Sequence, residues 1–399
     1  MSTATHLAER PALQPAPAAQ RFAAPTDFPD SPLSQAFQQP MLLGLFLNLQ
    51  DITRSTLPTS NTWTFDYNAK IVQQGEALGF DLAFSRTQWL PKGGYDGEAS
   101  LDSFIALGAM AAITKKILLI STIHVLYGPL HPLHIAKYGA TLDHIAKGRW
   151  GINIVTGHRA IEHEMFGWSR IEHDDRYALA GELFDVVQTL WSSDENFSAE
   201  GRQGWKVTNG FITPKPLFAR PVLVNATGSD AGIEFAANYS DIVFVTSPGG
   251  SGIQAALDTL PAHTAQIRRA AAAAGRHGTR AIRTLINPVV VSRDTERETQ
   301  QYADAIVAGK TPGGLGAGNK YDSDAHAWRG RKEGTRDAGR GLGGNIEIVG
   351  TPEQVVEQLL ALKEAGIDGV QLGFHDFERD LAHFGERILP LMKSAGLRL

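Results

Sequence analysis

The feature of this sequence that most constrains its fold is a repeat in which a short apolar run precedes an amphipathic helical segment. A run of about four to eight apolar residues between turn residues is typical of a strand buried on both faces. The first such run is Met41–Leu47, and the alternation continues almost to the C-terminus. Consecutive strand–helix units give parallel strands joined by right-handed crossovers. The sequence therefore predicts an α/β fold.

Two α/β architectures fit this alternation, a closed barrel and an open doubly wound sheet. About eight strand–helix units, in a core near the roughly 250 residues typical of such barrels, favour the closed form. No G-x-G-x-x-G follows the first strand, which weakens the case for a dinucleotide-binding sheet. We therefore predict a TIM (β/α)8 barrel. Its strands are expected at residues 41–47, 80–84, 117–123, 150–155, 221–225, 242–245, 283–291 and 369–374, and its helices at 67–78, 101–113, 131–145, 174–191, 230–239, 253–274, 352–365 and 377–393.

Three segments lie outside this repeat, and the barrel domain is expected to span residues 40–399. Residues 1–39 are rich in Ala, Pro and Gln and show no signal-peptide pattern, so we predict a disordered extension. Residues 192–214 are polar and suggest an inserted hairpin. Residues 308–345 are dense in Gly, and a loop of this length is usually functional or disordered. A lid over the site and a surface insertion without function both remain open.

Composition excludes several function classes. The 399 residues include no cysteine, which excludes disulfides, thiolate metal sites and cysteine nucleophiles. A formal net charge of -5 argues against a nucleic-acid-binding protein, because such proteins usually carry a basic balance or a basic face. No stretch approaches the roughly 20 apolar residues that span a bilayer. We therefore expect a cytoplasmic protein without a membrane or nucleic-acid partner.

Polar residues recur directly after the predicted strands, although the strands themselves are apolar. Active sites of TIM barrels lie at the C-terminal ends of the strands, so these residues are the first candidates for a site. They are Asn48, Ser85–Gln88, Thr122–His124, Asn153–His158, Thr227–Ser229, Thr246–Gly250 and Gly373–Asp376.

The segment Ala226–Gly232 (ATGSDAG) is the sharpest local feature at that edge. A strand, a glycine-containing turn and then Ser229 and Asp230 at a helix start present free backbone N–H groups, which suit a phosphate. The same residues also suit an ordinary N-cap, in which Ser229 or Asp230 caps its own helix. The residues alone leave both interpretations open.

Residues 153–177 are rich in His and Glu, which raises the question of a metal ion. The spacing of His158, Glu162, His163, Glu164 and His173 is not the H-E-x-x-H pattern that places two imidazoles on one helix face. We therefore expect no metal site and interpret His163 and Glu164 as solvated helix surface. A serine hydrolase is not expected either, because no G-x-S-x-G follows a strand.

Several longer motifs resemble those of one family when taken in order. They are EALGFDLAFS from Glu76, ATLDHIAKGRWGINIVTGH from Ala140, DDRY from Asp174, KPL from Lys215, ATGSDAG from Ala226 and VGTPEQVVEQLLALKEAGIDGVQLGFHDFERDLAHFGERILPLM at the C-terminal end. The chain resembles the bacterial luciferase-like flavin monooxygenase superfamily over about residues 41–392. The resemblance is strongest to the branch that contains dimethylsulfone monooxygenase and pyrimidine oxygenase.

This resemblance implies that FMN binds at the C-terminal mouth of a TIM barrel. Carried over by matched motif, the implied flavin contacts are Thr87, Gln88, Asn153, Glu162, Arg176 and Tyr177, with a phosphate site at Gly228 and Ser229. Arg176 is a candidate second phosphate ligand, because a guanidinium fork matches phosphate oxygens.

The resemblance also implies an oxygen pocket formed by Thr122 and Asn153. Two departures from pyrimidine oxygenases concern the substrate: the run HVLYGPLHP after Thr122 looks longer, and His158 stands where those enzymes commonly carry Trp. We take His124, His158 and His375 as candidates for substrate contact or proton transfer, because histidine titrates near neutral pH.

The function implied by the resemblance is that of a two-component monooxygenase. A separate flavin reductase would supply reduced FMN, O2 would be activated as a flavin peroxide at C4a or N5, and a small organosulfur or N-heterocyclic substrate would be oxygenated and cleaved. Three alternatives remain: an F420-dependent dehydrogenase of the same superfamily, a non-catalytic flavin-binding protein, and a ring-cleaving oxygenase or lyase acting on a flavin-like heterocycle. The resemblance also suggests a homodimer or homotetramer.

Overall fold

A closed barrel of parallel strands forms the centre of the computed structural model, which describes residues 18–47, 49–50, 55–92, 99–126, 131–310, 323–325, 337 and 339–399. The strands neighbour one another in the order β1 (Leu42–Phe46), β2 (Leu82–Ser85), β3 (Leu118–His124), β4 (Trp150–Val155), β7 (Val222–Thr227), β8 (Ile242–Val245), β9 (Arg283–Ile286) and β12 (Gly369–Leu372). Every pairing in the barrel is parallel. The predicted TIM barrel is therefore confirmed. Asn48 and most of the expected insertion at 308–345 lie outside the described residues.

The helices surround the barrel close to the positions that the sequence predicts. They are α3 (Phe65–Leu78), α4 (Ser103–Ala111), α5 (Pro132–Ala146), α7 (His173–Ser192), α8 (Asp230–Tyr239), α9 (Ile253–Ala273), α12 (Pro352–Glu364), α13 (Phe377–His383) and α14 (Leu389–Ser394), the last two joined by a π-helical turn at Phe384–Ile388. Gly79 ends α3 in the left-handed conformation, as expected of a C-terminal glycine. No helix in the described part of the chain is long and apolar enough to cross a membrane.

The strand expected at residues 283–291 is two strands. After β9, the chain leaves the barrel, and β10 (Pro288–Val291) pairs with β11 (Ile346–Val349) in a separate parallel pair. Pro288 has no backbone N–H, so a barrel strand that continued through it would lose one hydrogen bond to a neighbouring strand. The sequence patterns also missed α6 (Ala160–Met165), α10 (Glu296–Ala308) and β11. The inserted hairpin is present as the antiparallel pair β5 (Phe197–Glu200) and β6 (Lys206–Gly210).

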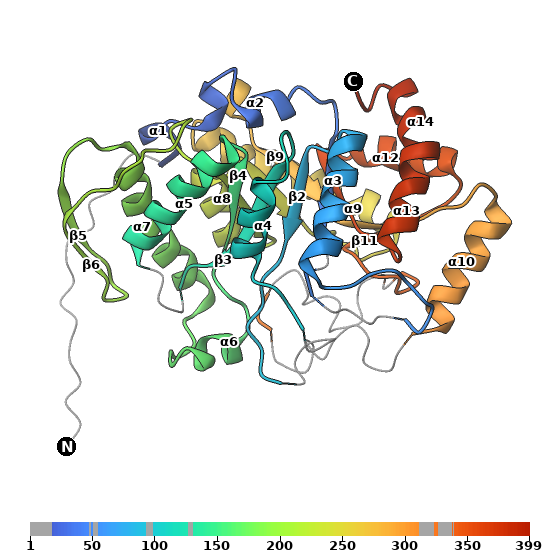
Figure 1. Ribbon diagram of the computed structural model, residues 1–399, viewed down its shortest axis with the longest axis horizontal. Coiled ribbons are helices and arrows are strands. Elements are labelled where there is room, and N and C mark those ends of the chain that lie inside the picture. Colours follow the sequence, from blue (N-terminus) through green and yellow to red (C-terminus); the bar gives the residue numbers. More distant parts are fainter. Residues whose placement is uncertain are drawn as a thin grey trace.

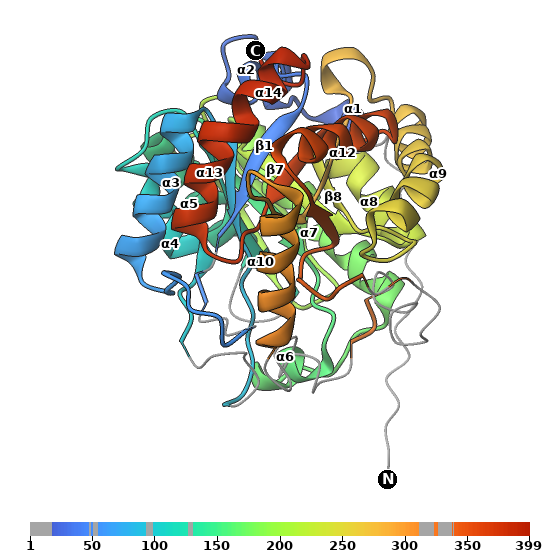
Figure 2. The ribbon, with the colours of Figure 1, turned by 90° about the vertical axis from the view of Figure 1, so that its right-hand side faces the viewer.

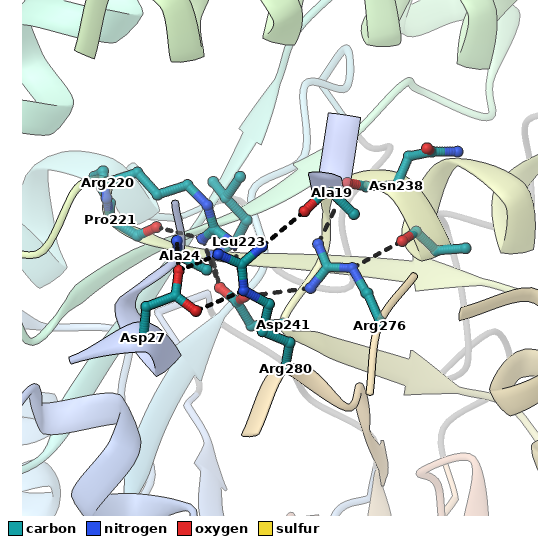
Figure 3. A network of polar contacts seen from close by, with 11 residues as sticks. Ala19, Ala24, Asp27, Arg220, Pro221, Leu223, Asn238, Asp241, Arg276 and Arg280 are labelled. Atoms are coloured by element: carbon teal, nitrogen blue, oxygen red, sulfur yellow. Dashed lines mark hydrogen bonds and ion pairs between the residues drawn. The ribbon is translucent and has the colours of Figure 1, made fainter. Parts of the chain in front are cut away.

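Residues 1–17 lie outside the described residues, and the prediction of a disordered extension was wrong for residues 18–39. This segment forms α1 (Ala18–Arg21), a 3-10 turn at Pro25–Asp27 and α2 (Pro32–Ala36), which Ser31 caps. Two contacts that composition does not indicate hold the segment in place. Leu33 is fully buried, and Asp27 forms an ion pair with Arg280, in the turn before β9 (Figure 3). Figures 1 and 2 place α2 at one end of the barrel and α6 at the other.

Two apolar cores explain why the alternation specifies this fold. The inner core fills the barrel and consists of alternate strand residues together with Leu33 of α2, which lies at the end of the barrel where α2 is found. The strand residues of this core are Leu42, Leu82, Phe84, Leu118, Ile120, Val222, Val224, Ile242, Phe244 and Leu285. The residues between them point outward and pack under the helices, as Leu43, Leu119 and Leu223 do. Strands buried on both faces therefore carry nearly continuous apolar runs.

Asp143, in α5, provides a test of the packing between this helix and the loop before β7. Its side chain is 1% exposed and accepts a hydrogen bond from Leu217 N at 2.7 Å. Burial raises the pKa of Asp143 from 3.8 to about 6. Because the folded-state pKa lies above the unfolded value, the contribution of Asp143 to the free energy of unfolding is fully present below about pH 4. It falls as the pH rises through 6, by on the order of 2–3 kcal/mol.

We expect Asp143→Asn to raise the free energy of unfolding at pH 7 by on the order of 1–2 kcal/mol, because the amide oxygen keeps the Leu217 contact without a buried charge. Urea unfolding at pH 4.5 and pH 7 measures this effect. The gain should be much smaller at pH 4.5, where wild-type Asp143 is already protonated in the folded protein. An equal gain at both pH values would contradict the assignment.

Candidate functional site

The C-terminal end of the barrel is the accessible end. The inward-facing residues are buried along most of each strand, whereas those at the C-terminal ends of three strands are more exposed. Phe46 and Val155 are half-buried, and Ala226 is exposed. The opposite end is filled by Leu33. The open end is where the active site of a TIM barrel lies, and α6 lies at this end in Figure 1.

Thr122 and Asn153 form a buried polar pair inside this end. Both continue inward-facing rows, because Ile120 precedes Thr122 by two residues in the barrel interior and Ile152 and Ile154 on either side of Asn153 point outward. Asn153 Nδ2 donates to Thr122 Oγ1 at 3.0 Å, and Thr122 Oγ1 donates to Ser85 O at 2.8 Å. The Oδ1 atom of Asn153 is buried without a hydrogen-bond partner among the described residues. The two residues that the resemblance assigns to an oxygen pocket are therefore in direct contact.

His124, at the end of β3, lies beside the buried carboxylate of Glu162. The distance from His124 Nε2 to Glu162 Oε1 is 3.8 Å, and Arg159 Nη1 lies 3.8 Å from Glu162 Oε2. Glu162 Oε1 also accepts from Trp89 N at 3.2 Å. Burial, with His163 and Arg159 nearby, lowers the pKa of His124 to about 3. The imidazole is therefore neutral at physiological pH.

His158 belongs to the same end of the barrel but makes a different contact. Its Nδ1 lies 2.7 Å from Ser323 Oγ, and burial with Arg159 and His124 nearby lowers the pKa of His158 to about 3. His375 follows β12, and its Nε2 is buried without a partner among the residues described. Burial also lowers the pKa of His375.

The interpretation of His163 as solvated surface was wrong, whereas its neighbour Glu164 is exposed as expected. His163 is 1% exposed, and burial lowers its pKa to about 4. The short helix α6 turns this side chain inward, a direction that the sequence did not indicate.

The N-terminus of α8 has the form of an anion-binding cradle. Ser229 is the N-cap, and its Oγ accepts a hydrogen bond from Gly232 N at 3.2 Å. The prediction that Ser229 caps its own helix is therefore confirmed. Gly228, in the turn before it, is exposed. A Cβ on Gly232 would lie 1.9 Å from Thr227 Oγ1 and 2.9 Å from Tyr177 Oη, so these hydroxyls close over the helix start. Capping and anion binding are compatible, because further N–H groups of the first turn remain.

Arg176 and Tyr177 reach this region from the start of α7. Burial raises the pKa of Tyr177, although Thr227, Arg176 and Ser229 act in the opposite direction. Arg176 is buried, and its two terminal nitrogens bind the carboxylate of Asp324, Nη1 to Oδ2 and Nη2 to Oδ1, each at 2.9 Å. Ser229 and Arg176, the predicted phosphate ligands, and Tyr177, a predicted flavin contact, are thus on neighbouring elements, with Asp324 beside Arg176.

Thr87 differs from the other predicted site residues. Its Oγ1 accepts a hydrogen bond from Ser103 N at 3.1 Å, so its hydroxyl helps to begin α4. Gln88, the next residue, is half-buried beside Trp89, whose amide reaches Glu162.

Two residues at this end were not identified from the sequence. Asp324 lies 148 positions from Arg176, inside a Gly-rich segment whose composition gives no indication of a carboxylate contact. Gln371 lies between the outward-facing Val370 and Leu372, is 1% exposed, and its Nε2 has no partner in the described part of the chain. A polar residue within an otherwise apolar strand was the available signal for Gln371.

The chain is similar to known proteins over most of its length. The family model of luciferase-like monooxygenases matches residues 45–369. The chain is 32% identical over 348 residues to an FMNH2-dependent dimethylsulfone monooxygenase of Pseudomonas fluorescens (strain Pf0-1), covering 85% of this chain and 90% of that protein. It is 31% identical over 352 residues to the pyrimidine monooxygenase RutA of Stutzerimonas stutzeri (strain A1501), covering 83% and 90%.

Solved structures show the same fold at lower identity. The riboflavin lyase RcaE matches with a TM-score of 0.76 at 23% identity, over 90% of this chain and 93% of that chain. DmoA from Hyphomicrobium sulfonivorans matches with a TM-score of 0.73 at 22% identity, over 90% and 89%. The match of the family model and the identity to two curated relatives over most of their length establish the relationship: this chain belongs to the luciferase-like monooxygenase family.

Proposed function

We propose that this protein is a two-component monooxygenase that binds reduced FMN at the open end of the barrel and uses it to activate O2. The observation that carries the proposal is the buried pair Thr122 and Asn153, which faces this end and retains an amide oxygen without a partner among the described residues. A polar pair above an apolar barrel core is suited to hold a small polar molecule in a fixed orientation. Membership of the family and the named cofactor of the dimethylsulfone monooxygenase relatives support the assignment.

The residues present fit FMN. The first turn of α8 offers backbone N–H groups and the Ser229 hydroxyl to a phosphate, and the missing Cβ of Gly232 leaves room for the Thr227 and Tyr177 hydroxyls beside them. Tyr177 and Arg176 Nε, which has no partner among the described residues, add donors from α7. By matched motif, Gln88, Glu162 and Asn153 would contact the flavin ring system, whereas the Thr87 hydroxyl is already engaged with α4.

When bound, reduced FMN supplies the electrons that activate O2. The chain itself holds the reacting groups in position beside two buried polar side chains, Thr122 and Asn153. The Ser85 carbonyl fixes the Thr122 hydroxyl, which in turn fixes the plane of the Asn153 amide. A side chain held in this way needs no reorganisation when charge develops beside it.

His124 and His158 are proposed to form hydrogen bonds to the substrate rather than to supply protons. With a pKa of about 3, each imidazole is neutral at pH 7 and has no excess proton to donate. A neutral imidazole has one N–H donor and one acceptor nitrogen; one nitrogen of His158 faces Ser323 Oγ and one of His124 faces Glu162, so the proposed substrate contact uses the other nitrogen of each ring. This refines the general proton-transfer role that the sequence suggested for them.

The proposed substrate is a small organosulfur or N-heterocyclic compound. Phe46, Phe84 and Phe244, on inward-facing rows of three strands, form an edge-to-face cluster with ring centroids 5.0 Å (Phe46 to Phe84) and 4.8 Å (Phe84 to Phe244) apart, which gives the barrel interior an apolar aromatic surface. The two kinds of curated relative, named for dimethylsulfone and for pyrimidine, support these two classes. A separate flavin reductase is the proposed partner, and a homodimer or homotetramer is the proposed assembly.

A single experiment tests this function. Photoreduced FMN is bound anaerobically, the complex is mixed with oxygenated buffer, and product and hydrogen peroxide are measured with dimethyl sulfone, an alkanesulfonate and uracil in turn. We expect one class to yield an oxygenated product in proportion to the flavin oxidised. Hydride transfer with F420 and no use of O2, or failure to bind FMN, would overturn the proposal.

A further inference from the structure

The hydrogen bonds of Arg176 use only part of its guanidinium group. A guanidinium has five N–H donors, arranged as an end-on fork of the two terminal nitrogens and a side-on fork of Nε and one terminal nitrogen. In Arg176 the end-on fork binds Asp324, and Nη1 also donates to Ile171 O at 2.8 Å. Nε and the second N–H of Nη2 have no partner among the described residues. The side-on fork of a buried arginine is therefore left for an anion.

Asp324 is itself held from several sides. Arg170 Nη2 lies 2.8 Å from Asp324 Oδ2, so the carboxylate is shared between two arginines. Asp324 N donates to His158 O at 3.0 Å, and the adjacent Ser323 hydroxyl lies 2.7 Å from His158 Nδ1. The position of the carboxylate is thus fixed by the loop after β4 as well as by Arg176.

This pair lies beside the phosphate cradle of α8. Tyr177, the residue after Arg176, closes over Gly232 at the start of α8. Both Arg176 and Asp324 influence the ionisation of the Tyr177 hydroxyl electrostatically, and so do the neighbouring Thr227 and Ser229 through hydrogen bonds. Arg170 and Arg176 together carry one more positive charge than Asp324 neutralises, which favours a second anion.

We propose that Asp324 is a positioning residue for the flavin phosphate: by gripping the end-on fork of Arg176, it presents the side-on fork to a phosphate seated at the N-terminus of α8. This inference rests on the proposed FMN site and deepens it. Without the carboxylate, the buried guanidinium would be free to rotate about its side-chain bonds, and ordering it again would weaken binding. The effect should appear with ligands that carry the 5′-phosphate and not with riboflavin, which lacks it.

The test is a set of binding titrations with FMN and with riboflavin on the full-length protein. For Asp324→Asn we expect about tenfold weaker FMN binding and unchanged riboflavin binding, because an amide grips a guanidinium less firmly than a carboxylate does. Asp324→Glu should recover part of the loss. Arg176→Lys should weaken FMN binding at least as much, and adding Asp324→Asn to it should change little further, because both residues act on one contact.

Asp174→Asn is the matched control. It removes the same charge two residues from Arg176, but the Asp174 side chain is 73% exposed and pairs with His173. We expect FMN binding within about twofold of wild type, because exposed charges near a site contribute little.

The outcomes separate this inference from the proposed function. If wild-type protein binds FMN more tightly than riboflavin but Asp324→Asn leaves that preference intact, the positioning role fails and the FMN site stands. Tighter FMN binding by Asp324→Asn would also overturn it, because the carboxylate would then be a competitor of the phosphate. An equal loss for both ligands would indicate only a structural role. If wild-type protein binds neither ligand, the proposed function and this inference fail together.

Discussion

Replacement of Asn153 by leucine is expected to reduce substrate oxygenation by roughly a hundredfold or more while FMN affinity changes by less than about threefold. Leucine has the same branched shape and number of side-chain heavy atoms as asparagine, but it removes the donor to Thr122 and the Oδ1 atom that has no partner among the described residues. If this amide holds oxygen or the reacting part of the substrate, its loss acts on the chemical step and not on cofactor binding. Single-turnover product yield and an FMN titration measure the two effects separately.

Asn225→Leu is the control for removing a buried amide at the same end of the barrel. Asn225 is 1% exposed and donates to Ile154 O at 2.9 Å, but it continues the outward-facing row of Leu223 and so points toward the helices. We expect this variant to lose stability and to keep its turnover per folded molecule. If Asn153→Leu instead lost FMN binding and oxygenation in equal measure, its contact with the flavin would account for both losses and the oxygen-pocket role would fail.

The fold could be predicted from sequence because the barrel strands are buried on both faces. An apolar run such as Trp150–Val155 is typical of a strand that is covered on both faces, by the barrel interior and by the surrounding helices. Its observed bounds match the prediction. The failures occurred where tertiary contacts outweigh composition. Residues 18–39 read as disordered, yet one side chain, Leu33, fits the closed end of the barrel and anchors the segment. A single buried leucine leaves no periodic signal in the sequence.

The candidate site was predictable only in part, for a related reason. Residues that directly follow strands, such as Thr122, His124 and Ser229, are brought together by the parallel arrangement of the barrel. Contacts from outside the repeating units follow no such rule. Asp324 meets Arg176 across 148 positions, and no local pattern marks that pairing. The low pKa of His124 likewise depends on burial beside Arg159 and His163, which spacing does not reveal.

The end of the barrel opposite the site is held by a buried ionic network, shown in Figure 3. Arg220 binds both oxygens of Asp241 at 2.7 Å, Leu223 N donates to the same carboxylate at 3.0 Å, and Arg276 Nη1 lies 3.7 Å from it. Burial alone would raise the pKa of Asp241, but the two guanidinium groups and the Leu223 N–H hold it below its usual value. The stability that this carboxylate contributes is therefore present above about pH 4 and is lost as the pH falls.

We expect Asp241→Asn to lower the free energy of unfolding by about 3–5 kcal/mol at pH 7, because Arg220 and Arg276 would remain buried without a counter-charge. Asp27→Asn is the matched control: it removes an Asp–Arg pair at the same end, but Asp27 and Arg280 are 25% and 30% exposed, so the expected loss is below about 1 kcal/mol. Urea unfolding of both variants gives the comparison. FMN binding by the folded fraction should be unchanged in each, since the network lies away from the open end. Equal losses from the two substitutions would mean that the buried network is no more important than a surface ion pair, and that apolar packing around Leu33 closes this end of the barrel.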